Sequence, residues 1–168
     1  AFAGTGGTAS SIAAADAQTA NLSPAPLQPA DALLVVKRER KLYLLRNGQP
    51  FRSYRVALGL NPTGHKEREG DYRTPEGRYS IVRRNPDSEF FLSLGISYPD
   101  QSDMKRAKKT GVKPGGSIMI HGQPNVPKRA SAWYQTADWT NGCIALSNDD
   151  MLEVWLLTRN NLPIEIRP

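Results

Sequence analysis

Two side chains that are far apart in the sequence could together carry out acyl transfer. Cys143 is the only cysteine, and His121 is one of two histidines. A lone thiol cannot form a disulfide within its own chain, so Cys143 is present either for packing or for reactivity. A free thiol with a pKa of about 8.5 is only slightly ionised at neutral pH, so a catalytic cysteine needs a base, for which His121 is the candidate. Gly142 leaves room for a substrate carbonyl and lets backbone N–H groups face a developing oxyanion.

A buried and unreactive Cys143 is the alternative. Free cysteine is among the residue types most often buried, and the apolar residues 144–146 suit the start of a core strand. Composition alone favours this alternative, because a single cysteine with a distant histidine is a weak pattern. Residues 139–142, however, are polar and turn-forming up to the residue before the thiol. They predict that Cys143 lies at the mouth of a strand, where a substrate can reach it.

The arrangement of these residues resembles the L,D-transpeptidase catalytic domain, whose members act on bacterial peptidoglycan stem peptides. An apolar strand ends in Ile-His-Gly at residues 120–122, and after a variable loop Thr-Asn-Gly-Cys follows at residues 140–143. The resemblance covers about residues 33–167, and segments upstream of the motif agree with it at residues 34–44, 56–59 and 74–79. It implies that Cys143 is the nucleophile and His121 the general base, and that a carbapenem would acylate the enzyme.

The resemblance also implies the groups around the nucleophile. The backbone carbonyl of Gly122 would orient the His121 imidazole. The N–H groups of Gly142 and Cys143 would be the oxyanion donors, with Asn141 in the same turn. No cofactor and no metal are expected, because neither histidine has a paired ligand spacing with the cysteine.

The motif departs from the family's common signature at two places. The family usually has histidine before the Gly-Cys pair, where this chain has Asn141, and arginine or asparagine soon after it, where this chain has residues 144–146. These departures resemble a subgroup that includes a hydrolase releasing a lipoprotein from the cell wall. Transpeptidation is the function expected. An L,D-carboxypeptidase or an amidase cleaving the diaminopimelate–lipoprotein link is the alternative, followed by a non-catalytic wall-binding module. Stem peptides, and with the amidase a wall-linked lipoprotein, are the expected partners.

The segment between the two parts of the motif is rich in proline and aromatic residues. Residues 124–139 are too polar for an ordinary connection and too aromatic for a disordered one. They predict a lid or substrate-binding loop, with a surface excursion packed by its own aromatic side chains as the alternative. The candidate substrate-binding residues are Trp133, Tyr134, Trp139 and Thr140.

The remaining charged residues are expected at the surface. His65 lies in a long polar loop over residues 61–73, and we expect it to be exposed and outside the active site. The formal net charge is +6, with basic runs at residues 37–41 and 105–109. Each run predicts a solvated face or a polyanionic partner such as an acidic wall polymer. The aromatic residues do not alternate with the basic ones, which argues against nucleic-acid binding.

Composition divides the chain into two parts. Residues 1–30 are rich in alanine, serine, threonine and glycine, and we expect a flexible leader or tether without a signal peptide. Residues 31–168 are long enough to form one catalytic domain with its own core. The resemblance implies a periplasmic or cell-envelope enzyme of cell-wall biogenesis and cell shape, and we expect a monomer.

Short alternating segments predict a mainly β (α+β) fold. Residues 33–45 predict two strands, and Asn47-Gly48 predicts a tight hairpin leading into a strand over residues 51–58. Further strands are expected at residues 78–82, 90–98, 117–120 and 162–166. A short helix is expected at residues 100–110, and a principal helix follows a cap at Ser147. We therefore expect a compact mixed-sheet sandwich or barrel with two helices.

Overall fold

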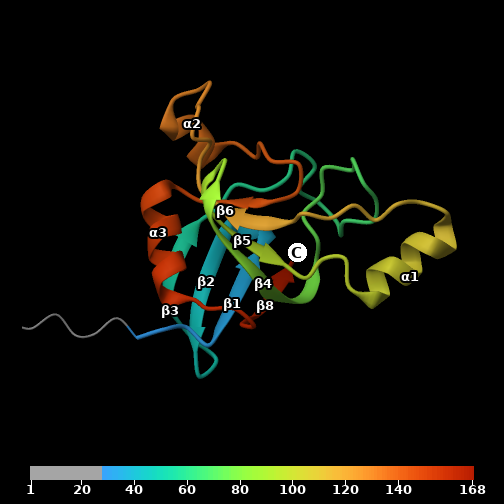
Figure 1. Ribbon diagram of the computed structural model, residues 1–168, viewed down its shortest axis with the longest axis horizontal. Helices are drawn as coiled ribbons and strands as arrows, with labels where there is room; N and C mark the ends of the chain where they lie inside the picture. Colours follow the sequence, from blue (N-terminus) through green and yellow to red (C-terminus); the bar gives the residue numbers. More distant parts are fainter. Residues whose placement is uncertain (1–27) are drawn as a thin grey trace, which may run out of the picture.

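Eight strands form one mixed sheet in the order β3-β2-β1-β8-β4-β5-β6-β7 in the computed structural model of the protein (Figure 1). The structure describes residues 28–168. The leader predicted over residues 1–30 therefore lies outside the described residues except for its last three. Of these, Ala30 is buried and donates its N–H to the carbonyl of Leu157 at 2.8 Å.

The elements follow one another along the chain with few long connections. The strands are β1 (Ala32–Val36), β2 (Lys41–Arg46), β3 (Gln49–Arg55), β4 (Gly77–Ser88), β5 (Phe91–Ile96), β6 (Met119–His121), β7 (Ile144–Ala145) and β8 (Pro163–Arg167). The helices are α1 (Gln101–Thr110), α2 (Ser131–Thr136) and α3 (Asn148–Leu157), together with the short 3-10 turn η1 (Lys37–Glu39). The prediction of a mainly β fold with a mixed sheet is confirmed.

The last strand of the chain joins the two halves of the sheet. β8 runs parallel to β1 on one side and antiparallel to β4 on the other. β4 continues beyond β8 and pairs with β5, so its length links the first three strands to β5, β6 and β7. Ile164 and Ile166 of β8 are buried, as are Leu33 and Val35 of β1, because alternate side chains on each strand face the core.

The segment that follows the N-terminal hairpin crosses to the other end of the sheet. Asn47 and Gly48 have φ angles of 51° and 75°, which confirms the predicted tight hairpin. β3 ends at Arg55, earlier than predicted, because the chain then turns away to pair with β7. Ala57 donates its N–H to the carbonyl of Ala145 at 2.8 Å, and Ala145 donates back at 2.9 Å. Residues 57–59 are therefore held next to β7 and Thr140.

The two predicted helices are present and capped by their own sequences. Asp100 and Asp103 form a reciprocal capping box at the start of α1, and Gly111 ends the helix with a φ of 71°. Ser147 accepts the N–H of Asp150 at the start of α3. α3 lies against the sheet, whereas α1 projects from the body of the molecule (Figure 1). Within residues 28–168, no helix combines the length and apolar character needed to span a membrane.

The third helix, α2, was not predicted from the sequence. It has six residues, which is too short for an apolar period to be recognised, and no side chain caps its first turn. Contacts with the preceding loop hold it instead: Gln123 donates to the Ser131 carbonyl at 3.2 Å and accepts from the Ser131 hydroxyl at 3.0 Å. The predicted lid segment is therefore an ordered, partly helical excursion.

Two adjacent leucines in α3 test the packing of this helix. Leu157 is 1% exposed and Leu156 is 60% exposed. Leu157→Ala should lower the free energy of unfolding by about 2–5 kcal/mol, because it leaves a cavity in the core. Leu156→Ala, the matched control, should change it by about 0.5 kcal/mol or less. Urea denaturation of both variants measures the difference, and equal losses would contradict the orientation of α3.

Candidate active site

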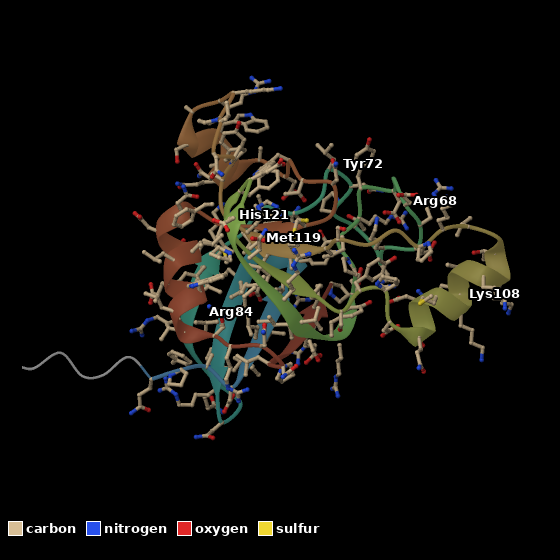
Figure 2. The ribbon with its side chains drawn as sticks, in the orientation of Figure 1. Arg68, Tyr72, Arg84, Lys108, Met119 and His121 are labelled. Atoms are coloured by element: carbon tan, nitrogen blue, oxygen red, sulfur yellow. The ribbon has the colours of Figure 1, made fainter. Side chains whose placement is uncertain are left out.

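Strand pairing brings Cys143 beside the end of β6. β6 and β7 are parallel, with Ile120 opposite Ile144, so Cys143 lies level with Met119. His121 is two residues further along β6, and side chains at this spacing share one face of a strand. Figure 2 shows the labelled Met119 and His121 close together on this strand. The thiol and the imidazole therefore approach the same side of the sheet from neighbouring strand ends.

A cavity of about 330 Å³ opens over these two side chains. Its walls come from three separate segments of the chain: Phe90, residues 116–119 with His121, and residues 139–141 with Cys143. Cys143 is half-buried and so remains accessible from the cavity, whereas His121 is only 2% exposed. The prediction of Cys143 at the mouth of a strand is confirmed.

The His121 imidazole has a defined tautomer. Its Nδ1 lies 2.7 Å from the carbonyl oxygen of Gly122, and because a carbonyl can only accept, Nδ1 carries the proton and Nε2 is free to act as a base. The ring stacks on Phe90 at a centroid distance of 4.4 Å and meets the Trp139 ring edge-on at 5.6 Å. Burial lowers the pKa of His121 to about 4, although the Gly122 contact acts in the opposite direction.

The Cys143 thiol is held by two backbone groups. The Met119 N–H donates to Sγ at 3.4 Å, and Sγ lies 3.5 Å from the carbonyl oxygen of Ser117. Burial raises the pKa of Cys143 above its usual value, while the Met119 N–H and the positive charge of Lys66 lower it. The thiol and His121 are consequently both neutral near pH 7 in the resting state. A reaction in which Cys143 attacked a carbonyl would therefore require transfer of the thiol proton to a base, for which His121 Nε2 is the candidate.

The turn before the thiol has a backbone shape that glycine permits. Gly142 has a φ of 130°, and a Cβ at this position would lie 2.6 Å from the carbonyl oxygen of Arg73. The Gly142 N–H donates to Thr140 Oγ1 at 3.1 Å, and the Thr140 hydroxyl donates to the Cys143 carbonyl at 2.7 Å. Within residues 28–168 the Cys143 N–H has no hydrogen-bond partner. Of the two expected oxyanion donors, Cys143 N–H is the one that is free.

Three of the four predicted substrate-binding residues line a cavity. Trp139 and Thr140 line the cavity that contains Cys143, together with Asn141. Tyr134 instead lines a second cavity of about 590 Å³, which shares Phe90 with the first. Trp133 is 39% exposed and packs edge-on against Tyr134, so it lies at neither cavity.

Sequence reasoning missed Phe90 and the residues before His121. Ser117 and Met119 precede His121 at alternate positions, so the period of the strand could have placed them on its face. No comparable signal marks Phe90. It reaches His121 because β5 pairs with β6, with Ser93 opposite His121.

The prediction of an exposed His65 is wrong, although it does lie outside the Cys143 cavity. Its side chain is 20% exposed, and its Nε2 lies 2.8 Å from a carboxylate oxygen of Asp103. The Glu76 N–H donates to His65 Nδ1 at 2.8 Å, which places the ring proton on Nε2. His65 therefore joins the polar loop to α1. No group of three metal-ligating side chains occurs within residues 28–168.

The sequence model of a protein family, the L,D-transpeptidase catalytic domain (YkuD), matches residues 30–166. The chain belongs to this family. YafK of Escherichia coli strain K12, provisionally named an L,D-transpeptidase, is 32% identical to it over 94 residues, which are 52% of this chain and 36% of YafK. The chain thus spans about a third of the length of the curated relative that it matches.

Solved structures share the fold. The helical cell shape determining protein Pgp2 of Campylobacter jejuni is 25% identical with a TM-score of 0.61, over 80% of this chain and 46% of Pgp2. Bd1075 of Bdellovibrio bacteriovorus is also 25% identical, with a TM-score of 0.56 over 83% of this chain and 51% of Bd1075. An L,D-transpeptidase of Xylanimonas cellulosilytica, 14% identical with a TM-score of 0.55 over 83% of this chain and 61% of its own, supports the fold alone.

The raised pKa of Cys143 predicts that its thiol reacts slowly with alkylating reagents in the resting state. Below its pKa the group is a neutral thiol, so the rate of alkylation by iodoacetamide at pH 7 should be well below that of free cysteine under the same conditions. The rate should still be rising at pH values where alkylation of free cysteine has already levelled off, because burial raises the pKa of the Cys143 thiol. Mass spectrometry of the alkylated protein at a series of pH values measures this. A plateau reached below pH 7 would show a preformed thiolate and contradict the neutral resting state.

Proposed function

We propose that this chain catalyses L,D-transpeptidase-type acyl transfer on peptidoglycan stem peptides, through a thioester on Cys143. The observation that carries the proposal is the His121 ring, whose Nδ1 is held by the Gly122 carbonyl. This contact leaves Nε2 as a base, and both His121 and Cys143 line one cavity. Membership of the family supports peptide bonds of the cell wall as the substrate class.

The first half of the reaction forms the thioester. Cys143 Sγ attacks the carbonyl carbon of the amide at an L-centre–D-centre bond, and its proton passes to His121 Nε2. The carbonyl oxygen becomes an oxyanion that the free Cys143 N–H stabilises. When this intermediate collapses, the C–N bond breaks and the leaving amine takes the proton from Nε2. The products are a thioester on Cys143 and a free D-amino acid.

The second half transfers the acyl group. An acceptor amine attacks the thioester carbonyl and gives its proton to Nε2, and the sulfur leaves and recovers a proton from the imidazolium. Water in the place of the amine would give hydrolysis by the same steps. Phe90, Ile118, Met119 and Trp139 form the apolar part of the cavity, beside the polar residues Ser117, Thr140 and Asn141. Apolar walls next to a thioester disfavour water as the acceptor, which supports transfer to an amine.

This site belongs to an enzyme that works where peptidoglycan is exposed. We infer a place in the periplasm or cell envelope and a contribution to cell-wall biogenesis and cell shape. The likeness of this chain to Pgp2, a helical cell shape determining protein, supports the contribution to cell shape. A wall-linked lipoprotein as donor would require an amidase, for which the cavity residues give no specific support.

A muropeptide assay distinguishes the two outcomes. Incubated with tetrapeptide muropeptides and a D-amino acid as the amine, the wild-type protein should exchange the terminal residue, whereas Cys143→Ala should give no product. His121→Gln should lower the rate by about 10²-fold or more, because the general base is lost. Liquid chromatography with mass spectrometry measures the products, and a thermal melt of each variant confirms folding.

Two results of this assay would contradict the proposal. Tripeptides as the only product, at every concentration of D-amino acid, would establish hydrolysis instead of transfer. Full turnover by a folded Cys143→Ala variant would remove the thioester mechanism altogether.

A further inference from the structure

The turn between β1 and β2 carries basic side chains that point into the protein. Lys37 is 3% exposed, and the side chain of Arg40 is 27% exposed. The solvated face predicted for this basic run is therefore wrong for both residues. Arg38, which lies between them in the sequence, is exposed. Arg40 has a φ of 52°, and this left-handed residue ends η1 and turns the chain into β2.

Lys37 binds three groups of the loop that connects β3 to β4, residues 56–76. Its Nζ donates to the backbone carbonyls of Gly64 and Thr74, both at 2.8 Å, and lies 3.4 Å from a carboxylate oxygen of Glu76. These contacts use all three N–H donors of the ammonium group. A buried ammonium whose donors are all engaged fixes the relative positions of its acceptors. The loop is thereby attached to the turn at both ends of its span from residue 64 to residue 76.

The attached loop packs directly against the backbone of Gly142, the residue before Cys143. The Thr74 side chain accepts the Gly59 N–H at 3.2 Å. A Cβ at Gly59 would lie 2.0 Å from the Tyr72 carbonyl oxygen and 3.1 Å from the Gly142 Cα, and a Cβ at Gly142 would lie 2.6 Å from the Arg73 carbonyl oxygen. Three stretches of backbone are thus packed without intervening side chains. A shift of residues 72–74 has to move Gly142 as well.

Arg40 holds Asp138, the residue before Trp139 in the wall of the cavity. Its guanidinium binds the Asp138 carboxylate through Nε at 3.0 and 3.1 Å and through Nη2 at 2.8 Å. Asp138 also accepts the Leu58 N–H at 3.0 Å. The next residue is Trp139, whose ring meets His121 edge-on at a centroid distance of 5.6 Å. A bidentate pair of this kind fixes orientation as well as distance.

We propose that Lys37 and Arg40 are positioning residues that act together, one on the wall behind Gly142 and the other on the wall that carries Trp139. The inference rests on the proposed function. In this role the turn sets where the Cys143 N–H lies relative to the oxyanion and where the aromatic wall meets His121. Neither side chain lines the cavity that contains Cys143. Their effect is therefore on geometry, and the reacting atoms are touched only by other residues.

Comparing two reactions of the same thiol tests this role. Acylation by a carbapenem passes through an oxyanion, whereas alkylation by iodoacetamide does not. Lys37→Met should lower the acylation rate by about 10²-fold, the cost of misplacing one oxyanion donor, and change the alkylation rate by about threefold or less. Arg38→Met, in the same turn but exposed, should change neither rate. Stopped-flow kinetics and intact-protein mass spectrometry give both rates.

A second pair of variants keeps the inference testable where Lys37→Met does not fold. Arg40→Ala should lower the acylation rate by about tenfold or more, and Arg40→Lys, which retains the charge and one contact with Asp138, should recover part of this loss. Amide hydrogen exchange at residues 140–143 should quicken in Lys37→Met or Arg40→Ala and remain unchanged in Arg38→Met.

The outcomes separate this inference from the proposed function. If the wild-type protein is acylated but the Lys37 and Arg40 variants keep its acylation rate and its exchange at residues 140–143, the positioning role is overturned. Equal losses of acylation and alkylation would also overturn it, because they would show a general effect on the thiol. If the wild-type protein is not acylated at Cys143, the proposed function fails, and the exchange measurement alone decides whether the turn holds residues 140–143 in place.

Discussion

The parallel pairing of β6 with β7 is the constraint on which the site depends. It sets Cys143 level with Met119 and two residues from His121 along the neighbouring strand. A slip of one residue would turn the strand's side chains to the other face of the sheet. β7 has only two residues, so its position depends on neighbours on both sides. Ala57 pairs with it on one side, and the Leu146 N–H donates to the His121 carbonyl at 2.8 Å.

Burial determines the protonation states of His121 and Cys143 at rest. Phe90 and Trp139 flank the His121 ring and exclude water from it, so the imidazole is neutral over most of the pH range. The same burial keeps the Cys143 thiol protonated at rest. A low local dielectric also strengthens the interaction between the Cys143 N–H and a developing oxyanion. In the proposed reaction, charge therefore develops at this site only during the attack, and the Cys143 N–H is free to stabilise it.

The motif residues could be predicted from the sequence, whereas their supports could not. Ile-His-Gly and Gly-Cys are local patterns, so the sequence could indicate that Cys143 and His121, which line one cavity, belong together and that the Gly122 carbonyl contacts His121. Most strands were also found, because alternation of apolar residues is a local signal. α2 was not predicted, because six residues are too few to show a helical period. Its stability comes from contacts with the loop before it.

The positions of Phe90, Lys37 and Arg40 at the site could not be predicted for a different reason. Phe90 reaches His121 only through the pairing of β5 with β6. Lys37 and Arg40 lie in a short basic run, which by itself predicts a solvated surface. Their partners, Thr74 and Asp138, are distant in the sequence, and only the folded sheet brings them within hydrogen-bond reach. Contacts of this kind leave no mark in a single sequence.

The pH dependence of Cys143 acylation tests the central claim most directly. His121 has to be neutral to accept the thiol proton, and it becomes protonated as the pH falls through its pKa of about 4. The rate constant for acylation by a carbapenem, measured by intact-protein mass spectrometry, should therefore stay level from about pH 8 down to about pH 5 and fall only below that. A fall centred near pH 6.5, the usual pKa of a solvated histidine, would contradict a buried neutral imidazole as the base. An acylation rate that is the same in His121→Gln as in the wild-type protein would also contradict it.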